Sequence, residues 1–337
     1  MGQSPDSSSY NENGEGIPFF QGNADFGERY PVTRVWCNAP TKIAQSEDIL
    51  ISVRAPIGAL NYAKEKCCIG RGLAAITPDK SKVSLEFVYW FLKGKNAELK
   101  SKGTGSTFKA ISKKILEEIL IPDVGFDKQH EYAQMLEKIY VIIQTRKQGL
   151  QKLDELIQSR FVELFGNPIS NSYGLPEATL PELGEFGRGV SKHRPRNDPR
   201  LLDGEYPLIQ TGDIANTDLY ITLYNSTYSE LGLQQSKMWN KGTLCITIAA
   251  NIAKTAILRF DACFPDSVVG FNANERTNNI FIHYWFSFFQ SILESQAPES
   301  AQKNINLKIL SELKVIVPKK EKQDEFVEFI NQLDKSK

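Results

Sequence analysis

Apolar and polar positions follow nearly the same pattern in two stretches of the chain that begin about 195 residues apart. Residues 48–76 align with residues 243–271 without a gap, and the apolar run at residues 50–53 coincides with residues 245–248. Both runs are rich in apolar and β-branched side chains, which is typical of a buried strand. The pattern therefore predicts a domain that occurs twice in one chain.

The repeat continues on both sides of these strands. A short apolar strand is predicted earlier in each copy, at residues 17–21 and 206–210. Four helices are predicted after the strands: residues 85–97 and 111–119 in the first copy, and residues 281–293 and 305–313 in the second. Each copy then ends in a Lys-Gln-x-Glu-aromatic motif, which starts at Lys128 and at Lys322. Each copy is therefore expected to be an α+β domain with a helix after it.

The segment from residue 127 to about residue 165 has a helical pattern instead. Its apolar stripe recurs at spacings of three and four residues and consists of Tyr132, Leu136, Ile139, Ile143, Leu150, Leu153, Ile157 and Leu164. This pattern is typical of a coiled coil of about five heptads, and at about 1.5 Å per residue it predicts a helix of about 58 Å. Gly166 and Pro168 are expected to end the helix.

A helix with such a stripe needs a partner. The matching helix after the second copy starts the same pattern at Phe326, Ile330 and Leu333, but the sequence stops at Lys337. Before Gly2, nothing corresponds to the lead-in at residues 175–188 of the second copy. We therefore expect a chain that is truncated or rearranged at both ends relative to its duplicated ancestor.

Composition limits the classes of function. The 40 basic and 40 acidic residues give zero net charge, which argues against binding DNA by bulk positive charge but not against recognising bases. A basic stretch nevertheless runs from Arg188 to Arg200. The five cysteines include no C-x-x-C pair, so a reducing cytoplasm without disulfides or zinc is expected. Cys68 and Cys263 hold equivalent positions among apolar residues, which favours core packing.

Several segments resemble a known family. They are the Gly2-Gln3-Ser4-Pro5 opening, residues 18–27, the strand at residues 48–54, the block at residues 103–121 and the helix end at residues 159–167. Together, and in this order, they resemble the specificity subunit of type I restriction–modification systems, and the resemblance covers essentially the whole chain. It implies two target-recognition domains at residues 1–122 and 167–318, a long spacer helix at residues 123–166 and a short helix at residues 319–337.

The resemblance also implies a function. The fold is expected to be α+β, with the long helix packed antiparallel to the shorter C-terminal helix. Each domain would recognise one half of a bipartite, asymmetric DNA site and direct other subunits to it, without catalysis by this chain. The partners would be double-stranded DNA, two methyltransferase subunits and restriction subunits. S-adenosylmethionine, ATP and magnesium are expected only in those partners, and the location is expected to be cytoplasmic.

Candidate DNA contacts lie in loops beside equivalent strands. Asn and Gln can pair with adenine, Arg with guanine, and Ser, Thr and Lys with phosphate. The candidates in the first domain are Gln21, Asn23, Arg54, Thr104, Ser106, Thr107 and Lys109. Those in the second domain are Lys192, Arg194, Arg196, Gln210, Thr211, Asp213, Asn251, Lys254, Gln302 and Lys303. Each could equally be a solvated loop residue, and the basic stretch at residues 192–196 could be only a flexible linker.

The unpaired half of the long helix should be covered. Its candidate partner-binding residues are Leu150, Leu153, Ile157, Phe161 and Leu164. We expect a methyltransferase subunit or a second copy of the chain on this face, and self-association of the isolated chain. A metal site is not expected, because His130, His193 and His283 lack ligand-like spacing.

Catalytic motifs do not appear in the sequence. Asn167-Pro168 is followed by Ile169 rather than by the Pro-aromatic pair of an adenine methyltransferase, and Pro265-Asp266 precedes no Glu-x-Lys of a nuclease. A Walker A lysine loop is also missing. The alternatives to a DNA-recognition subunit are a coiled-coil scaffold that binds proteins and a truncated, silent form of a specificity subunit.

Overall fold

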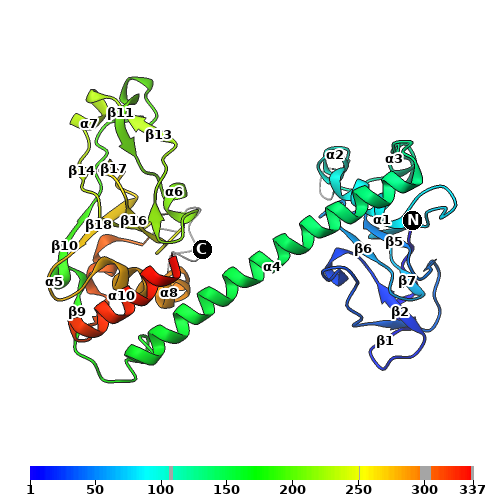
Figure 1. The fold of residues 1–337 in the computed structure, drawn as a ribbon, viewed down its shortest axis with the longest axis horizontal. Helices are drawn as coiled ribbons and strands as arrows, with labels where there is room; N and C mark the ends of the chain where they lie inside the picture. The colour runs from blue at the N-terminus through cyan, green and yellow to red at the C-terminus, as the bar shows by residue number, and fades with distance from the viewer. Residues whose placement is uncertain (106–108, 250, 297–304, 335–337) are drawn as a thin grey trace. The chain divides into compact units, whose positions relative to one another are not determined.

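The computed structural model describes residues 1–105, 109–249, 251–296 and 305–334. These residues form two compact units, Met1–Arg146 and Lys147–Lys337. Figure 1 shows that each unit combines small sheets with a few helices and that the long helix α4 (Phe126–Phe165) contributes residues to both.

The first unit contains two sheets with the strand orders β6-β5-β8 and β1-β3-β2-β7-β4. Its strands are β1 (Tyr10–Asn11), β2 (Ile17–Phe20), β3 (Trp36–Cys37), β4 (Ile43–Ala44), β5 (Ile49–Ser52), β6 (Leu60–Tyr62), β7 (Cys67–Ile69) and β8 (Leu73–Ile76). Its helices, besides α4, are η1 (Ser7–Ser9), η2 (Asn23–Asp25), α1 (Leu85–Gly94), α2 (Asn96–Ser101) and α3 (Lys113–Glu117).

The second unit contains three sheets with the orders β10-β18-β15-β16-β12, β13-β11-β17-β14 and β19-β9. Its strands are β9 (Glu177–Thr179), β10 (Gly184–Arg188), β11 (Leu202–Leu208), β12 (Tyr220–Ile221), β13 (Ser226–Tyr228), β14 (Met238–Trp239), β15 (Leu244–Thr247), β16 (Thr255–Leu258), β17 (Ala262–Cys263), β18 (Val268–Ala273) and β19 (Lys314–Ile316). Its helices are α5 (Leu180–Leu183), η3 (Pro199–Leu201), α6 (Thr211–Ala215), α7 (Glu230–Gln234), α8 (Asn279–Gln296), α9 (Leu307–Glu312) and α10 (Lys320–Asp334).

The strand registers confirm the internal duplication. Ile49 of β5 faces Tyr62 of β6, and at the same offset Leu244 of β15 faces Ile257 of β16. A parallel bridge pairs Phe19 with Cys68 in the first unit, and the second unit repeats it between Leu208 and Cys263. Because a slip of one residue would turn every side chain to the other face, conserved register means that the same faces are buried in both units.

Two glycines show the same correspondence, one in each unit. The Gly2 N–H donates to the Leu73 carbonyl oxygen at 2.8 Å, and the Gly189 N–H donates to the Val268 carbonyl oxygen at 2.8 Å. A Cβ at either glycine would clash with carbonyl oxygens of the facing loop. Only glycine allows this close approach of two backbones, so Gly2 and Gly189 are equivalent positions.

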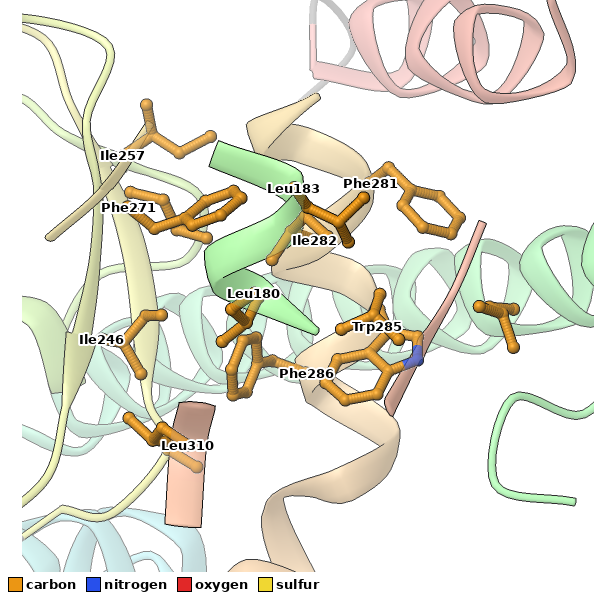
Figure 2. Packing of buried hydrophobic residues seen from close by; sticks show 14 of the residues in the cluster. Leu180, Leu183, Ile246, Ile257, Phe271, Phe281, Ile282, Trp285, Phe286 and Leu310 are labelled. Atoms are coloured by element: carbon orange, nitrogen blue, oxygen red, sulfur yellow. The ribbon is translucent and has the colours of Figure 1, made fainter. Parts of the chain in front are cut away.

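Burial of large apolar side chains explains where the helices lie. In the second unit, Trp285 and Phe286 of α8 are fully buried, together with Ile246 of β15 and Leu180 of α5. Figure 2 shows these side chains meeting between α8, α5 and the strands. In the first unit, Val88, Tyr89 and Leu92 of α1 pack against Ile49 and Ile51 in the same way. Cys68 and Cys263 are fully buried, as expected for core packing.

The C-terminal end of α4 packs against α10. Phe326 of α10 makes edge-on ring contacts with Phe161 and Phe165 of α4, at centroid distances of 5.3 and 5.8 Å. Further along α10, Leu333 lines the same cavity as Ile157, which precedes Phe161 in α4. The contacts therefore progress in opposite directions along the two helices. This confirms the predicted antiparallel packing and the predicted fold class.

Each copy has a buried glutamine that hydrogen-bonds the start of the following helix to the domain before it. The Gln129 side chain accepts from the Ser84 N–H at 2.8 Å and donates to the Val124 carbonyl oxygen at 2.7 Å. The Gln323 side chain accepts from the Thr277 hydroxyl at 2.9 Å and donates to the Pro318 carbonyl oxygen at 2.9 Å. The repeated Lys-Gln-x-Glu-aromatic motif thus has a structural role.

The two units differ at one edge. In the second unit, β19 pairs with β9 of the lead-in segment. The matching stretch in the first unit forms no strand, and Leu120 is 87% exposed there. The first copy therefore departs from the repeat here, because no strand equivalent to β9 is present among the described residues to pair with this stretch.

Candidate nucleic-acid interface

In the first unit, Gly72 links two of the predicted contact positions. The Gly72 N–H donates to the Gln21 carbonyl oxygen at 3.1 Å, and the Val53 N–H donates to the Gly72 carbonyl oxygen at 2.9 Å. Gln21 and Arg54 therefore emerge on either side of the same backbone segment. Both residues are exposed. The sequence predicts them on separate loops, and the fold brings these loops together.

The side chains of Asp25 and Ser4 hold Gln21 in place. Its backbone N–H donates to Asp25 Oδ2 at 2.7 Å, which caps the short helix η2 that includes Asn23. Its side-chain oxygen accepts from the Ser4 hydroxyl at 3.0 Å. The amide nitrogen of the Gln21 side chain can still donate, so the group can contact an acceptor on a base edge.

Arg54 lies beside the loop that carries the other candidates of this unit. An isolated bridge pairs Arg54 with Ala110, and a second bridge pairs Thr104 with Ala110. Thr104 and Lys109 are exposed, so the structure groups Arg54, Thr104 and Lys109 on one surface. The candidates Ser106 and Thr107 lie outside the described residues.

In the second unit, three predicted residues line one pocket. Arg196, Gln210 and Thr211 border a cavity of about 310 Å³, together with Ser191 and Ser226. The Gln210 backbone N–H donates to Asp213 Oδ2 at 2.8 Å, which repeats the Gln21–Asp25 arrangement. Because glutamine and arginine side chains offer donors and acceptors suited to base edges, this pocket can hold the edge of a base pair.

Asp213 has a structural role within the second unit. One carboxylate oxygen accepts from the Gln210 N–H, and the other accepts from the Asn225 side-chain amide at 2.9 Å. With both oxygens engaged within the protein, the carboxylate caps α6 and orders the loop before β13. Asp213 therefore positions Gln210, and a direct contact with a base is not needed to explain it.

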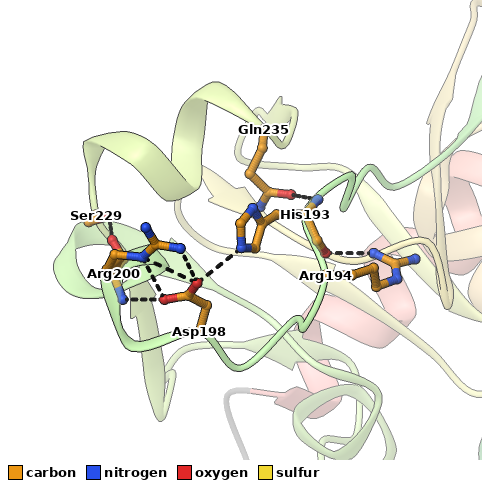
Figure 3. Close-up of polar contacts among 6 residues, drawn as sticks. All are labelled: His193, Arg194, Asp198, Arg200, Ser229 and Gln235. Carbon is orange, nitrogen blue, oxygen red and sulfur yellow. Dashed lines mark hydrogen bonds and ion pairs between the residues drawn. The ribbon is translucent and has the colours of Figure 1, made fainter.

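Carboxylates fix the arginine side chains in residues 192–196, the central part of the basic stretch. Arg194 and Arg196 both form ion pairs with Asp266, and the Arg194 guanidinium also donates to the Ser191 and His193 carbonyl oxygens at 2.6 and 2.8 Å. Figure 3 shows the neighbouring group, in which Asp198 pairs with Arg200 and with His193. This network does not fit the alternative of a flexible linker. Lys192 is exposed.

The electrostatics of Asp198 follow from this network. The hydrogen bonds from the Arg200 side chain and backbone N–H hold the pKa of Asp198 well below its ordinary value of 3.8. The same pairing raises the pKa of Arg200. Asp198 is therefore ionised over the whole physiological range and keeps the turn at η3 in place.

Lys254 and Asn251 lie elsewhere on the unit. Lys254 borders a separate cavity of about 320 Å³, which Asp218 and His283 also line. Asn251 is exposed, and its backbone carbonyl accepts from the Thr247 hydroxyl. Neither residue lines the Gln210 pocket, although Ala215 of α6, the helix that begins with Thr211, lines the same cavity as Lys254. The candidates Gln302 and Lys303 lie outside the described residues.

The candidate partner-binding residues of α4 fall into two groups. Leu150 is 47% exposed and Leu153 is half-buried. Ile157 and Phe161 are buried in the core of the second unit, and Leu164 packs against the same core. The expectation that a partner subunit covers them is corrected for Ile157 and Phe161, because the chain itself covers these two side chains.

Sequence reasoning missed the carboxylates at this site. In the sequence, Asp266 stands out only as part of a nuclease-like Pro-Asp pair, yet in the structure it binds two of the predicted arginines. The sequence contains one signal that sets Asp266 apart. It aligns with Arg71 in the repeat, so the charge at this position is opposite in the two copies. No group of residues suited to a metal ion occurs in the described part of the chain. Among the described helices, none is long and apolar enough to span a membrane.

The chain is similar to proteins of one known family. A family model described as "Type I restriction modification DNA specificity domain" matches residues 1–155 and residues 177–337. A "Putative type I restriction enzyme MjaX specificity subunit" of Methanocaldococcus jannaschii is 46% identical over 155 residues, which are 46% of this chain and 36% of that protein. The EcoBI specificity subunit of Escherichia coli is 22% identical over 317 residues, which are 85% of this chain and 66% of that protein. The chain thus spans less than two thirds of either relative.

A solved structure supports the fold. The type I restriction-modification system S subunit from M. genitalium matches 99% of this chain and 86% of its own chain, with a TM-score of 0.60 at 17% sequence identity. At this identity the likeness concerns the fold alone. The family model, by contrast, matches both copies of the duplicated domain and most of the sequence. The protein therefore belongs to the type I restriction modification DNA specificity domain family.

Proposed function

We propose that this chain is the DNA sequence-recognition subunit of a type I restriction–modification system and that it recognises a bipartite, asymmetric site. The observation that carries the proposal is the duplication. Two units share strand registers residue by residue, yet different side chains occupy their equivalent loops. The match of the specificity-domain model to each unit supports the same reading.

Two recognition units in one chain give higher selectivity than one. A half-site of a few base pairs offers only a few contacts, each worth about 1–3 kcal/mol of discrimination. One domain alone therefore separates its site poorly from the rest of a genome. Two domains in one chain multiply their selectivities, because the second contact becomes effectively intramolecular.

The residues proposed to contact DNA are those that the fold groups together. In the first unit they are Gln21, Arg54, Thr104 and Lys109, and in the second unit Lys192, Arg194, Arg196, Gln210 and Thr211. We assign the target-recognition domains to residues 1–122 and 167–318. We assign the spacer helices to residues 123–166 and 319–337, and the differences between the two sets of contact residues would make the site asymmetric.

The proposed partners follow from the exposed part of α4. Ile143 and Leu150 are 46% and 47% exposed, and such an apolar helix face needs a cover. We propose that methyltransferase subunits bind there, that restriction subunits join this core, and that the assembly is cytoplasmic. The partners would supply S-adenosylmethionine, ATP and magnesium, and catalysis would belong to them.

The proposal is tested by selecting duplexes from a random library with the full chain and a type I methyltransferase subunit. The expected result is one enriched sequence with two specified segments separated by unspecified positions. A protein-binding scaffold would enrich no sequence, and that outcome would reject the proposal. Equilibrium dialysis with labelled S-adenosylmethionine and the chain alone is expected to detect no binding, since the cofactor belongs to the partner.

A further inference from the structure

Asp266 occupies an unusual place for an acidic residue, because it faces a surface proposed to bind a polyanion. It precedes β18, next to Pro265 and Ser267, which line the Gln210 pocket. The Asp266 carboxylate pairs with the guanidinium groups of Arg194 (3.4 Å) and Arg196. Its backbone carbonyl also accepts from Arg188. One residue thus engages three arginines of the basic stretch.

The exposures of these groups show that the ion pairs can open. The side chains of Arg194 and Arg196 are 54% and 47% exposed, and that of Asp266 is 28% exposed. Ion pairs at such exposure contribute little to stability. A phosphate group, which binds arginine at least as well as a carboxylate does, can therefore replace Asp266 without disrupting a core.

The first unit shows what the same position looks like without a counter-ion. Arg71 is the aligned residue, in the loop that contacts the N-terminal stretch as Asp266 does in the second unit. Arg71 is exposed and forms no ion pair among the described residues. The aligned position thus carries an acidic residue in the second unit and a basic residue in the first.

We propose that Asp266 is a built-in counter-ion that competes with DNA phosphates for Arg194 and Arg196. On random DNA the carboxylate keeps both arginines, so binding stays weak. At the target, contacts in the Gln210 pocket position the duplex so that its phosphates displace the carboxylate. Asp266 thereby sets the ratio of specific to non-specific affinity. This inference rests on the proposed function and adds a residue that determines specificity.

The test measures binding of a random-sequence duplex to the full chain by fluorescence anisotropy over a range of salt concentrations. Asp266→Asn is expected to bind about tenfold more tightly at about 100 mM salt, because two guanidinium groups become available to phosphates. The slope of log affinity against log salt is expected to steepen by up to about 1.8, since each neutralised phosphate contributes about 0.9. Asp266→Ser, which also removes the charge, is expected to behave alike.

Two controls separate this effect from a general change of charge. Glu325→Gln removes a carboxylate that likewise pairs with two cations, Arg160 and Lys322, but on α10, and it is expected to leave the slope unchanged. Adding Arg194→Gln and Arg196→Gln to Asp266→Asn is expected to cancel the gain. Thermal unfolding of each variant confirms folding.

Unchanged or weaker binding of random duplex by both Asp266 variants would overturn the inference. So would an equal gain in the Glu325 variant. The proposed function is judged separately by the library selection with wild-type protein. A chain that selects a bipartite sequence but shows no Asp266 effect would keep the function and lose the counter-ion.

Discussion

At the scale of single residues, two buried amides show how the duplicated motif works. Gln129 and Gln323 are nearly inaccessible, and each is hydrogen-bonded through both its oxygen and its nitrogen. A buried polar group is stabilising only when its partners are in place, and removing one partner leaves the others unsatisfied at about 1–3 kcal/mol each. These amides therefore hold the helix start in one position on each domain.

Replacing Gln323 by leucine tests this role. The carbonyl oxygens of Arg276 and Pro318 would lose their donor in a buried site, so the free energy of unfolding is expected to fall by about 2–4 kcal/mol. Urea denaturation measures the change. Gln158→Leu, at an exposed position of α4, is expected to cost less than about 0.5 kcal/mol. Equal losses in both variants would contradict the assigned role.

Asp198 gives the protein a predictable response to acid. Arg200 lowers its pKa in the folded chain, so the folded state binds this proton less readily than the unfolded state does. Its stabilising effect is complete above the unfolded pKa near 3.8 and is lost as the pH falls through the lower folded value.

We expect Asp198→Asn to lose less thermal stability than wild type between about pH 6 and about pH 2.5, because the substituted side chain cannot take up a proton. Melting curves at both pH values provide the comparison. If wild type and variant lose the same amount, the carboxylate is not responsible for this part of the acid sensitivity.

At the scale of elements, α4 meets different surroundings along its length. Its periodic apolar stripe was predictable from spacing alone, because a helix places every third or fourth residue on one face. What covers the stripe was not predictable. Ile157 packs inside its own unit, whereas Leu150 remains exposed, although both belong to the same sequence pattern. Periodicity identifies a face that is to be buried and does not identify its neighbour.

Phe161 is expected to contribute strongly to the stability of the second unit. It lies against Phe281 of α8 at a centroid distance of 5.4 Å and against Phe326 of α10 at 5.3 Å. Phe161→Ala would leave a cavity between three helices and is expected to cost about 3–5 kcal/mol in the free energy of unfolding. Denaturant unfolding should show a much smaller change, below about 1 kcal/mol, for the half-exposed neighbour in Val162→Ala. Similar costs would mean that α4 is not anchored through Phe161.

The exposed part of α4 is expected to behave in the opposite way. Leu150→Glu should leave the melting temperature nearly unchanged, because the side chain has few contacts within the chain. It should weaken co-purification with a type I methyltransferase subunit at least tenfold, since a charge would be buried in the proposed interface. Undiminished co-purification would place the partner elsewhere. Glu155→Gln, on an exposed face of the same helix, serves as the control.

At the scale of the whole molecule, repetition made most of the fold predictable. The offset of 48–76 to 243–271 anticipated matching strands, and the registers of β5 with β6 and of β15 with β16 agree with it. The ion pairs of Asp266 could not be predicted from the sequence. They join residues about 70 positions apart, and the contact depends on how the loops fold. Helices and strands follow from local patterns, whereas a recognition surface is assembled from the ends of distant segments.

The two units present different side chains at equivalent positions. Equivalent backbones present Gln21 and Arg71 in one unit, and Gln210 and Asp266 in the other. A shared backbone with different side chains is what recognition of two unlike half-sites requires. Within one chain, each half of the site is therefore expected to depend on its own unit.

Sequencing of methylated bases tests this central claim most directly. DNA is treated with a type I methyltransferase subunit plus either the wild-type chain, Gln21→Ala or Gln210→Ala. We predict a bipartite motif for the wild type, relaxed in one half by the first variant and in the other half by the second. A single uninterrupted motif, or relaxation of the same half by both variants, would contradict the account.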